Sequence, residues 1–418
     1  MKKVLFVLYA YKPFENANTN VVLPLISEMK KQYEIHIVSL NVDNSALYSE
    51  IDENIHIYRY KAPGKIKRIL LQLYYTDPNK HRKGINGLVI PFGHWFSSIL
   101  IRFGILRHNE YILLKGLIQK NDYYFTISTC ESFVSCLNVL MLKKKNYLKC
   151  PWIVYFMDPF ARYIDNVGSK KYWKQEMEVY EKADRILVTE EIYEQNKKDD
   201  FSKFLYKTRA VKFCNFKIPN APEKNTFQLQ RKSGPINCVY AGSLINDKIR
   251  DPYYLFRIIN SLRGDFLFHL ILYRVPKDRL NQYKKIVSNT TKVIWYDTLS
   301  LKETKKIVAS SDILINLGNK VENQTPSKVF DYIATGKPIV NFISIENDSS
   351  LKYLKDYSFC LNIYEDDERV MENTQAFVRF CMSSKDKRVS NSQLRLYYSS
   401  YEQENAVKQF MKEIDEVI

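Results

Sequence analysis

The sequence predicts an α/β fold with two doubly wound, Rossmann-like domains, and three observations lead to this prediction. Short apolar runs alternate with longer amphipathic stretches in both halves of the chain, which is the pattern of a mostly parallel sheet covered by helices. A polar stretch rich in Pro, Asn, Lys, Gln and Ser separates the halves at about 218–235. A chain of 418 residues with 45% hydrophobic content suits two cores better than one.

The apolar runs predict the strands in order. In the first domain, at 1–217, they read VLFVLYA, EIHIVSL, IHIYRY, YYFTIS, WIVYFM and RILVTE, with a helix expected from Val22 to Lys31. The linker at 218–235 leads to a second domain at 236–398, with the runs INCVYAG, FLFHLIL, KVIWYD, DILINLG and PIVNFI. The last stretch, 399–418, has apolar residues at helical spacing and is predicted to pack back on the first domain.

The N-terminus and the cysteines indicate a cytoplasmic protein. The run after Lys3 imitates a signal peptide, but it ends at Lys12 and Pro13 without a cleavage site, so a first buried strand is the better interpretation. The sequence contains no run near the roughly 20 apolar residues that span a bilayer. The seven cysteines form no Cys-x-x-Cys pair and fit small apolar residues of a reducing compartment.

The net charge of +17 predicts an anionic partner, which nucleic acid, a membrane face or a phosphorylated substrate could supply. Nucleic acid is disfavoured because the aromatic residues fall mostly in predicted cores and no binding motif occurs. At about 61–120, basic clusters stand beside apolar runs and form an insert in the first domain. Two interpretations stay open for it, namely a peripheral contact with an anionic membrane and a solvated basic surface over ordinary helices.

The most informative segment is 319–338, which reads NKVENQTPSKVFDYIATGKP. A strand exit is followed by a helix start at which Ser327, Lys328 and Asp331 share one face. Free N–H groups and Lys328 can bind a diphosphate, while Asp331 can accept hydrogen bonds from a ribose diol. Ordinary capping is the alternative, but it does not explain a lysine in the first turn of a helix. The segment predicts a nucleoside-diphosphate site.

Together with YAGSLINDKIRDP at 240–252, this segment resembles the GT-B fold glycosyltransferases, and within them bacterial enzymes similar to glycosyltransferase family 4 of the cell-envelope polysaccharide type. The resemblance implies a GT-B fold with two domains facing across a cleft. In that family a glycine-rich strand exit grips the donor diphosphate. Gly242 and Lys248 match it, Ser243 stands at the usual Arg position, and Arg250 is expected to supply the missing charge.

The family's second motif has two acidic residues separated by seven positions. Asp331 occupies the second position, whereas the first falls on Asn323, beside Glu322. This departure leaves the sugar specificity open and makes activity itself less secure. The polar neighbours Asn319, Gln324 and Ser327 are expected at the same donor site.

The first domain matches the family loosely. The loop after its first strand reads PFENANTN, and its polar residues either touch the sugar or acceptor or cap a helix. These residues are Asn16, Asn18, Thr19 and Asn20. Asp158 follows the WIVYFM strand, and it either faces the sugar at the strand's carboxyl end or forms a turn with Pro159.

The resemblance implies retaining transfer of a sugar from a UDP- or GDP-linked donor to a hydroxyl group, with a lipid-linked envelope glycan as the expected acceptor. The expected catalytic residues are Asp158, Lys248, Arg250 and Lys328. Apart from the donor no cofactor is expected. Metal independence is predicted because no Asp-x-Asp motif follows a predicted strand, and none of the six histidines is an obvious catalyst. A sugar-nucleotide 2-epimerase of the same fold, and a non-catalytic partner subunit that has lost the first acid at Asn323, remain alternatives.

Overall fold

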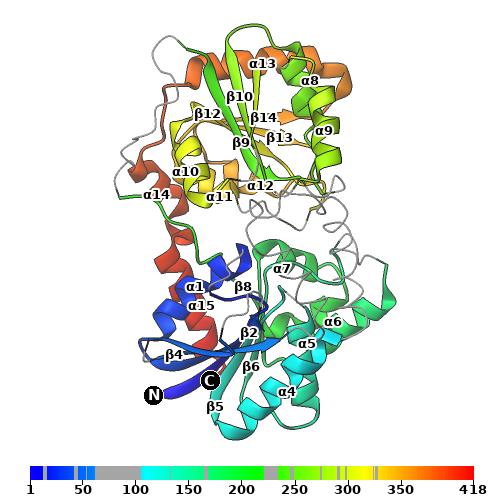
Figure 1. Ribbon diagram of the computed structural model, residues 1–418, viewed down its shortest axis with the longest axis vertical. Coiled ribbons are helices and arrows are strands. Elements are labelled where there is room, and N and C mark those ends of the chain that lie inside the picture. The colour runs from blue at the N-terminus through cyan, green and yellow to red at the C-terminus, as the bar shows by residue number, and fades with distance from the viewer. Residues whose placement is uncertain are drawn as a thin grey trace. The chain divides into compact units, whose positions relative to one another are not determined.

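The computed structural model describes residues 1–12, 17–41, 46–52, 54–61, 105–131, 133–163, 168–220, 234–244, 249–273, 275–289, 292–296, 299–322, 324 and 328–418 (Figure 1). Chain contacts divide it into two compact units. Unit 1 comprises Met1–Asn215 and Tyr401–Ile418, and unit 2 comprises Phe216–Ser400. Most of the predicted insert at 61–120 lies outside the described residues.

Unit 1 is built on one sheet, which has eight strands within the described residues, in the order β3-β4-β2-β1-β5-β6-β7-β8. The strands are β1 (Lys2–Val7), β2 (Tyr33–Asn41), β3 (Tyr48–Asp52), β4 (Ile55–Lys61), β5 (Tyr123–Thr129), β6 (Trp152–Phe156), β7 (Arg185–Val188) and β8 (Thr208–Ala210). All neighbours are parallel except the β3–β4 pair at the edge. Because β1 pairs with both β2 and β5, the strand order reverses between β1 and β5.

Helices bury both faces of this sheet. They are α1 (Ala17–Met29), α4 (Ile105–Lys120), α5 (Phe133–Lys144), α6 (Lys170–Lys182), α7 (Glu190–Asn196), the 3₁₀ helix η1 (Asp200–Lys207) and α15 (Gln403–Asp415). One core gathers α4, α5 and α6, and the other gathers α1 and α15. From α15, Phe410 and Ile414 are fully buried in this second core, and the Phe410 ring meets Tyr155 of β6 at 5.1 Å between centroids. The predicted return of the C-terminal helix to the first domain is confirmed.

Unit 2 has a parallel sheet with six strands among the described residues, in the order β11-β10-β9-β12-β13-β14. They are β9 (Ile236–Ser243), β10 (Phe266–Tyr273), β11 (Val293–Tyr296), β12 (Ile313–Leu317), β13 (Ile339–Ile343) and β14 (Cys360–Tyr364). Its helices are α8 (Tyr253–Ser261), α9 (Lys277–Ile286), α10 (Leu301–Ser310), α11 (Lys328–Ala334), α12 (Ser350–Leu354), α13 (Val370–Ser384) and α14 (Asn391–Tyr398), with the 3₁₀ helices η3 (Asp367–Arg369) and η4 (Ser399–Tyr401) near the last three.

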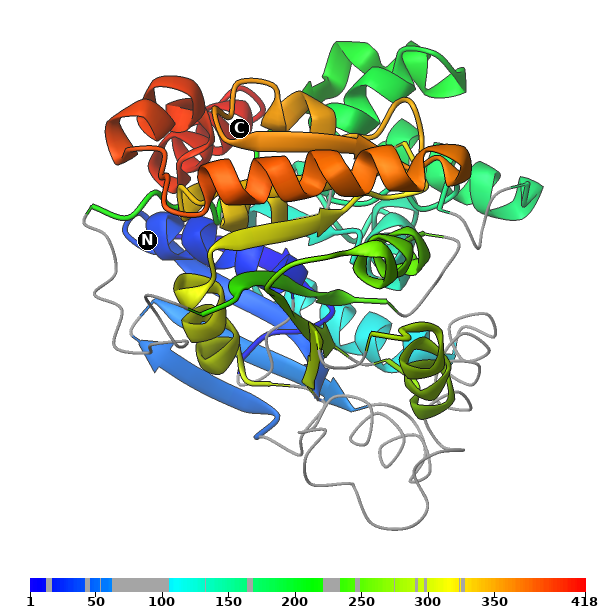
Figure 2. The same ribbon diagram turned by 90° about the horizontal axis from the view of Figure 1, so that it is seen from above.

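The long helix α13 lies along this second sheet (Figure 2), and its Phe377 ring stacks on Phe268 of β10 at 5.9 Å. Strand β9 pairs with β10 on one side and β12 on the other, so the order reverses between β9 and β12. The predicted fold class, with two Rossmann-like parallel-sheet domains, is confirmed.

Candidate functional site

The carboxyl ends of β9 and β12 are where a doubly wound sheet forms a ligand crevice, since the strand order reverses there. Strand β9 ends with Gly242 and Ser243, and β12 is followed by Gly318 and Asn319. Gly242 and Asn319, one predicted donor residue from each motif, therefore lie at neighbouring strand exits of the unit 2 sheet.

Gly242 brings the chain close to a lysine. A Cβ at this position would overlap the Tyr240 hydroxyl and lie 3.0 Å from the Nζ of Lys328, so only glycine fits. Lys328 is the first residue of α11, and its ammonium donates a hydrogen bond to the Ala241 carbonyl at the end of β9. The lysine therefore lies at the β9 exit, as the combined motifs predict.

Burial perturbs this lysine strongly. Desolvation, with a further contribution from the nearby Arg250, lowers the pKa of Lys328 to about 7, while Asp331 acts in the opposite direction. A phosphate group placed beside it would favour the charged form. The site holds a cation that lacks sufficient counter-charge from the protein.

Arg250 stands beside Lys328 and is held in place. Its Nη2 donates to Asn319 Oδ1 at 2.5 Å, and Asn319 Nδ2 donates to the Gln324 carbonyl at 2.5 Å. Burial raises the pKa of the Tyr240 hydroxyl, and the nearby Arg250 guanidinium partly offsets this rise in pKa. The structure thus brings together the predicted residues Gly242, Arg250, Asn319, Gln324 and Lys328.

The other predicted donor residues are more exposed than this cluster or lie outside the described residues. Glu322 is exposed and accepts a hydrogen bond from Asn347 Nδ2 at 3.3 Å, and Ser243 is partly exposed at the end of β9. Desolvation raises the pKa of the Asp331 carboxyl group, while the nearby Lys305 and Lys328 lower it. Lys248, Asn323 and Ser327 lie outside the described residues.

The sequence did not point to Asp348, which lies at the same edge. A Cβ on Gly318 would overlap its carboxylate, and Asp348 Oδ1 accepts from the amide and the hydroxyl of Ser350 at 2.7 and 2.5 Å. Burial raises the pKa of Asp348, while Ser350 and Arg250 lower it. The only sign of it in the sequence is the turn-forming run Asn347-Asp348-Ser349 after β13.

The two strand exits are also joined by an ion pair. Lys320, two residues beyond Gly318, pairs with Asp251, and its amide donates to the Ile249 carbonyl at 2.7 Å. Glu365, which follows β14, lies near this pair, and burial raises its pKa while Lys320 lowers it. These contacts fix the segment that carries Arg250 against the segment that follows β12.

At the β1 exit of unit 1, the predicted polar residues begin helix α1. The buried Thr19 donates its hydroxyl to the Ala10 carbonyl at 2.9 Å, which ties the start of α1 to the segment after β1. Asn18 and Asn20 are partly exposed in the same turn. Asn16 lies outside the described residues.

Asp158 lies just beyond the carboxyl end of β6 and is partly exposed. The loop that carries it is held by buried charges. Ala161 N donates to Glu176 Oε2 at 2.5 Å, and Arg162 pairs with Glu176 and Asp199 at 3.6 and 3.3 Å. Burial raises the pKa of Glu176, and Arg162 lowers it. Asp158 therefore sits on a fixed loop.

Comparison with solved structures identifies the fold. Thermosynechococcus elongatus sucrose-phosphate synthase matches with a TM-score of 0.69 and 11% identity over 100% of this chain and 99% of its own. An E. coli trehalose-6-phosphate structure bound with UDP-2-fluoro glucose matches with 0.68 and 10%, covering 100% of both chains. The apo lipopolysaccharide outer core galactosyltransferase WaaB matches with 0.61 and 13%, again over 100% of both. The chain has the GT-B fold of these proteins.

At these identities the likeness shows the fold alone. No protein-family model matches the chain. No curated protein matches it in sequence. Among the described residues, no helix is both long and apolar enough to cross a membrane.

Proposed function

We propose that the chain is a retaining glycosyltransferase, similar to family 4, that uses a UDP- or GDP-linked sugar as donor. The observation that carries this proposal is the Lys328 ammonium at the Gly242 exit of β9, beside Arg250. Two cations at the switch point of a doubly wound sheet fit a diphosphate, whose charge would compensate both. The GT-B fold supports the same assignment.

The proposed chemistry uses these cations to stabilise the leaving group. As the bond between sugar and diphosphate breaks, negative charge grows on the diphosphate, and fixed donors aimed at it lower the barrier. Lys328 and Arg250 are such donors, and Lys248 is proposed to join them. In the retaining route the departing phosphate oxygen takes the acceptor proton on the same face, so no strong protein base is required.

Unit 1 is proposed to supply the acceptor side. Asp158 is on a fixed loop at the end of β6, and Asn18 and Asn20 present amides near the β1 exit. The acceptor is proposed to be a lipid-linked envelope glycan, reached at the cytoplasmic face of an anionic membrane. The net charge of +17 and the fold shared with a lipopolysaccharide galactosyltransferase support this choice.

Transfer is proposed to need no metal ion, because Lys328 and Arg250 can provide the counter-charge that a divalent ion provides elsewhere. Loss of activity on chelation that manganese restores, while zinc does not, would overturn this proposal.

The proposal is tested first by thermal melting with a panel of nucleoside diphosphates and sugar nucleotides. A ligand at a hundred times its dissociation constant stabilises the folded state by about 2.7 kcal/mol. Product analysis with the donor alone then separates an epimerase from a transferase, which needs an acceptor hydroxyl. If no nucleotide raises the melting temperature of the wild-type chain, the donor-site assignment is wrong.

A further inference from the structure

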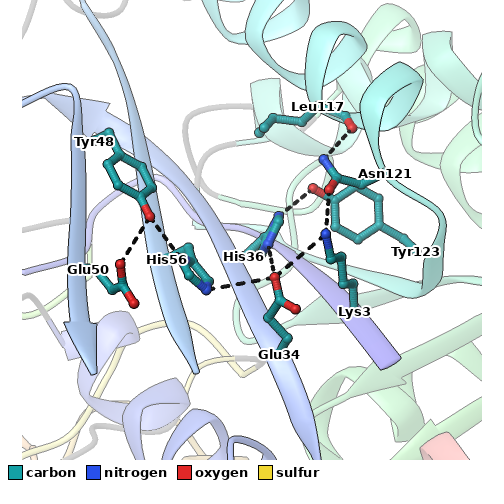
Figure 3. Close-up of polar contacts among 9 residues, drawn as sticks. All are labelled: Lys3, Glu34, His36, Tyr48, Glu50, His56, Leu117, Asn121 and Tyr123. Atoms are coloured by element: carbon teal, nitrogen blue, oxygen red, sulfur yellow. Dashed lines mark hydrogen bonds and ion pairs between the residues drawn. The ribbon is translucent and has the colours of Figure 1, made fainter. Parts of the chain in front are cut away.

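A second cluster of chemically capable side chains lies in unit 1, at the amino ends of β2 and β4 (Figure 3). Glu34 and His36 stand two residues apart on β2 and so share one face of the sheet. His56 of β4 is directly opposite His36 in the parallel register. The ligand atoms of these three residues all lie within 4.8 Å of one another.

The three side chains converge on one point. The Nε2 atoms of His36 and His56 lie 2.9 and 3.7 Å from the same carboxylate oxygen, Oε1 of Glu34. Zinc bonds of 2.0–2.1 Å in a tetrahedral site separate the ligand atoms by about 3.4 Å. Shifts of a few tenths of an ångström in side-chain position would bring both distances to this value.

The remaining ring nitrogens are held by tyrosines. His36 Nδ1 lies 2.8 Å from the Tyr123 hydroxyl, and His56 Nδ1 lies 2.9 Å from the Tyr48 hydroxyl. Tyr48 in turn donates toward Glu50 at 3.4 Å (Figure 3). In the metal-free chain the hydrogen bond to the Glu34 carboxylate places the proton of His36 on Nε2, so its Nδ1 accepts from Tyr123. A bound ion would take the Nε2 lone pair, with the ring proton moved to Nδ1 and donated to the tyrosine oxygen. Metal-binding histidines are oriented by outer partners of this kind.

We infer that Glu34, His36 and His56 form a binding site for one divalent transition-metal ion, with zinc the best match to two imidazoles and one carboxylate. Magnesium and calcium prefer oxygen ligands and fit this donor set poorly. Three protein ligands leave a fourth position for water. The inferred site does not depend on the proposed transferase activity.

One neighbouring group opposes a cation. Lys3 Nζ lies 3.7 Å from Glu34 Oε1, but it also donates to Asn121 Oδ1 at 2.8 Å, and Asn121 donates to the Leu117 carbonyl at 2.9 Å. This second contact holds the ammonium to the side of the three ligands. Removing the charge of Lys3 should therefore tighten metal binding, whereas in a simple hydrogen-bonded network it would have no such effect.

The position of the cluster indicates a structural ion. It lies at the amino ends of the strands, whereas ligands of doubly wound sheets bind at the carboxyl ends. An ion here would join β2 to β4, which carries the antiparallel edge strand β3. Metal binding should therefore raise the thermal stability of the chain.

The test uses the full chain without a histidine tag, stripped by a chelator and titrated with zinc in competition with a chromophoric chelator. We expect one zinc ion per chain and a higher melting temperature. Removing a residue that only orients a ligand typically weakens metal binding by roughly tenfold to hundredfold. Glu34→Gln and His56→Gln each remove a ligand, so each should weaken zinc binding by more than this. His108→Gln, at an exposed histidine of α4, is the matched control and should leave binding unchanged.

Two milder variants keep the test decisive if a ligand variant fails to fold. Tyr48 is 47% exposed, so Tyr48→Phe should fold and weaken zinc binding about tenfold. Lys3→Met should strengthen it. Absence of zinc binding by the wild-type chain, or equal affinity in the wild type, Tyr48→Phe and Lys3→Met, would overturn the inference.

Discussion

The two units follow the same topological rule but carry different chemistry at corresponding places. In unit 2 the first strand ends with Gly242 and Ser243, where Lys328 approaches Gly242 and Arg250 lies near Lys328. In unit 1 the first strand is followed by the start of helix α1. There the buried Thr19 hydroxyl donates a hydrogen bond to the Ala10 carbonyl, and the neighbouring side chains of Asn18 and Asn20 are uncharged amides. The sheet decides where a ligand can bind, and the side chains at that edge decide which ligand it is.

The largest expected effect is on turnover, from Lys328→Met. Loss of one charged stabiliser of a developing anion costs about 3 kcal/mol, so donor-dependent sugar transfer should fall about a hundredfold. Lys302→Met, at an exposed lysine of α10, is the control and should keep wild-type turnover. Equal turnover in the two variants would contradict the assignment of the donor diphosphate to the unit 2 strand exits.

The same variant should not damage the fold. The pKa of Lys328 is lowered to about 7 from its ordinary value of 10.5. Below pH 7 the lysine is charged in both the folded and the unfolded chain, so the whole cost of burying its charge reduces the stability of the folded state. That cost fades as the pH rises toward 10.5, because the unfolded chain binds the extra proton in this window. Lys328→Met should accordingly raise the unfolding free energy of the ligand-free protein more at pH 6 than at pH 10.

A glycine in each unit sharpens the comparison. Gly242→Ala would place a methyl group against Tyr240 and Lys328, and overpacking of this kind costs about 1–3 kcal/mol. Gly116→Ala in α4 meets open space and should stabilise by about 0.5–1 kcal/mol, since alanine suits a helix better. Chemical denaturation measures both changes. A neutral Gly242→Ala variant would contradict the described contact.

Donor affinity should depend on pH through Lys328. A bound diphosphate favours the ammonium, so binding above pH 7 requires proton uptake and weakens as the pH rises. With a pKa of about 7, affinity for a sugar nucleotide should fall roughly tenfold between pH 7 and pH 8.5. Lys328→Arg should make the affinity nearly independent of pH over this range. Calorimetry at both pH values measures the difference, and a flat wild-type profile would argue against the role of Lys328.

The smallest effect is expected in unit 1. Asp158→Asn keeps the shape of the side chain and removes its charge, so the acceptor step should slow about tenfold while nucleotide affinity stays at the wild-type value. Steady-state kinetics with varied acceptor separates the two effects. A loss of nucleotide affinity instead would assign Asp158 to the donor.

The buried parallel strands were predictable because burial on both faces leaves a continuous apolar run. β10 reads FLFHLILY, and its His269 is structural, since it bonds Asn237 and Tyr296. The edge strands β3 and β14 and the short β8 gave no such run, and in β14 only Ile363 is buried. Helix α1 starts five residues earlier than Val22, at Ala17, because its polar first turn carries no apolar periodicity.

For the sites, local motifs were readable and distant contacts were not. The spacing in 319–338 by itself points to Lys328, whereas the contact of Lys328 with the β9 exit depends on the fold. The approach of Asp348 to Gly318 joins segments 30 residues apart and leaves no local pattern. Likewise, Ile-His-Ile occurs in both β2 and β4, but only the strand register places His36 opposite His56.

The most direct test is a calorimetric titration of UDP, GDP, ADP and TDP into the wild-type chain and Lys328→Met at pH 6.5. We expect at least one nucleotide to bind the wild-type chain at a single site, with affinity lowered severalfold or more in the variant. No heat with any of the four, or the same affinity in both proteins, would contradict the assignment of the diphosphate site to Gly242, Arg250 and Lys328.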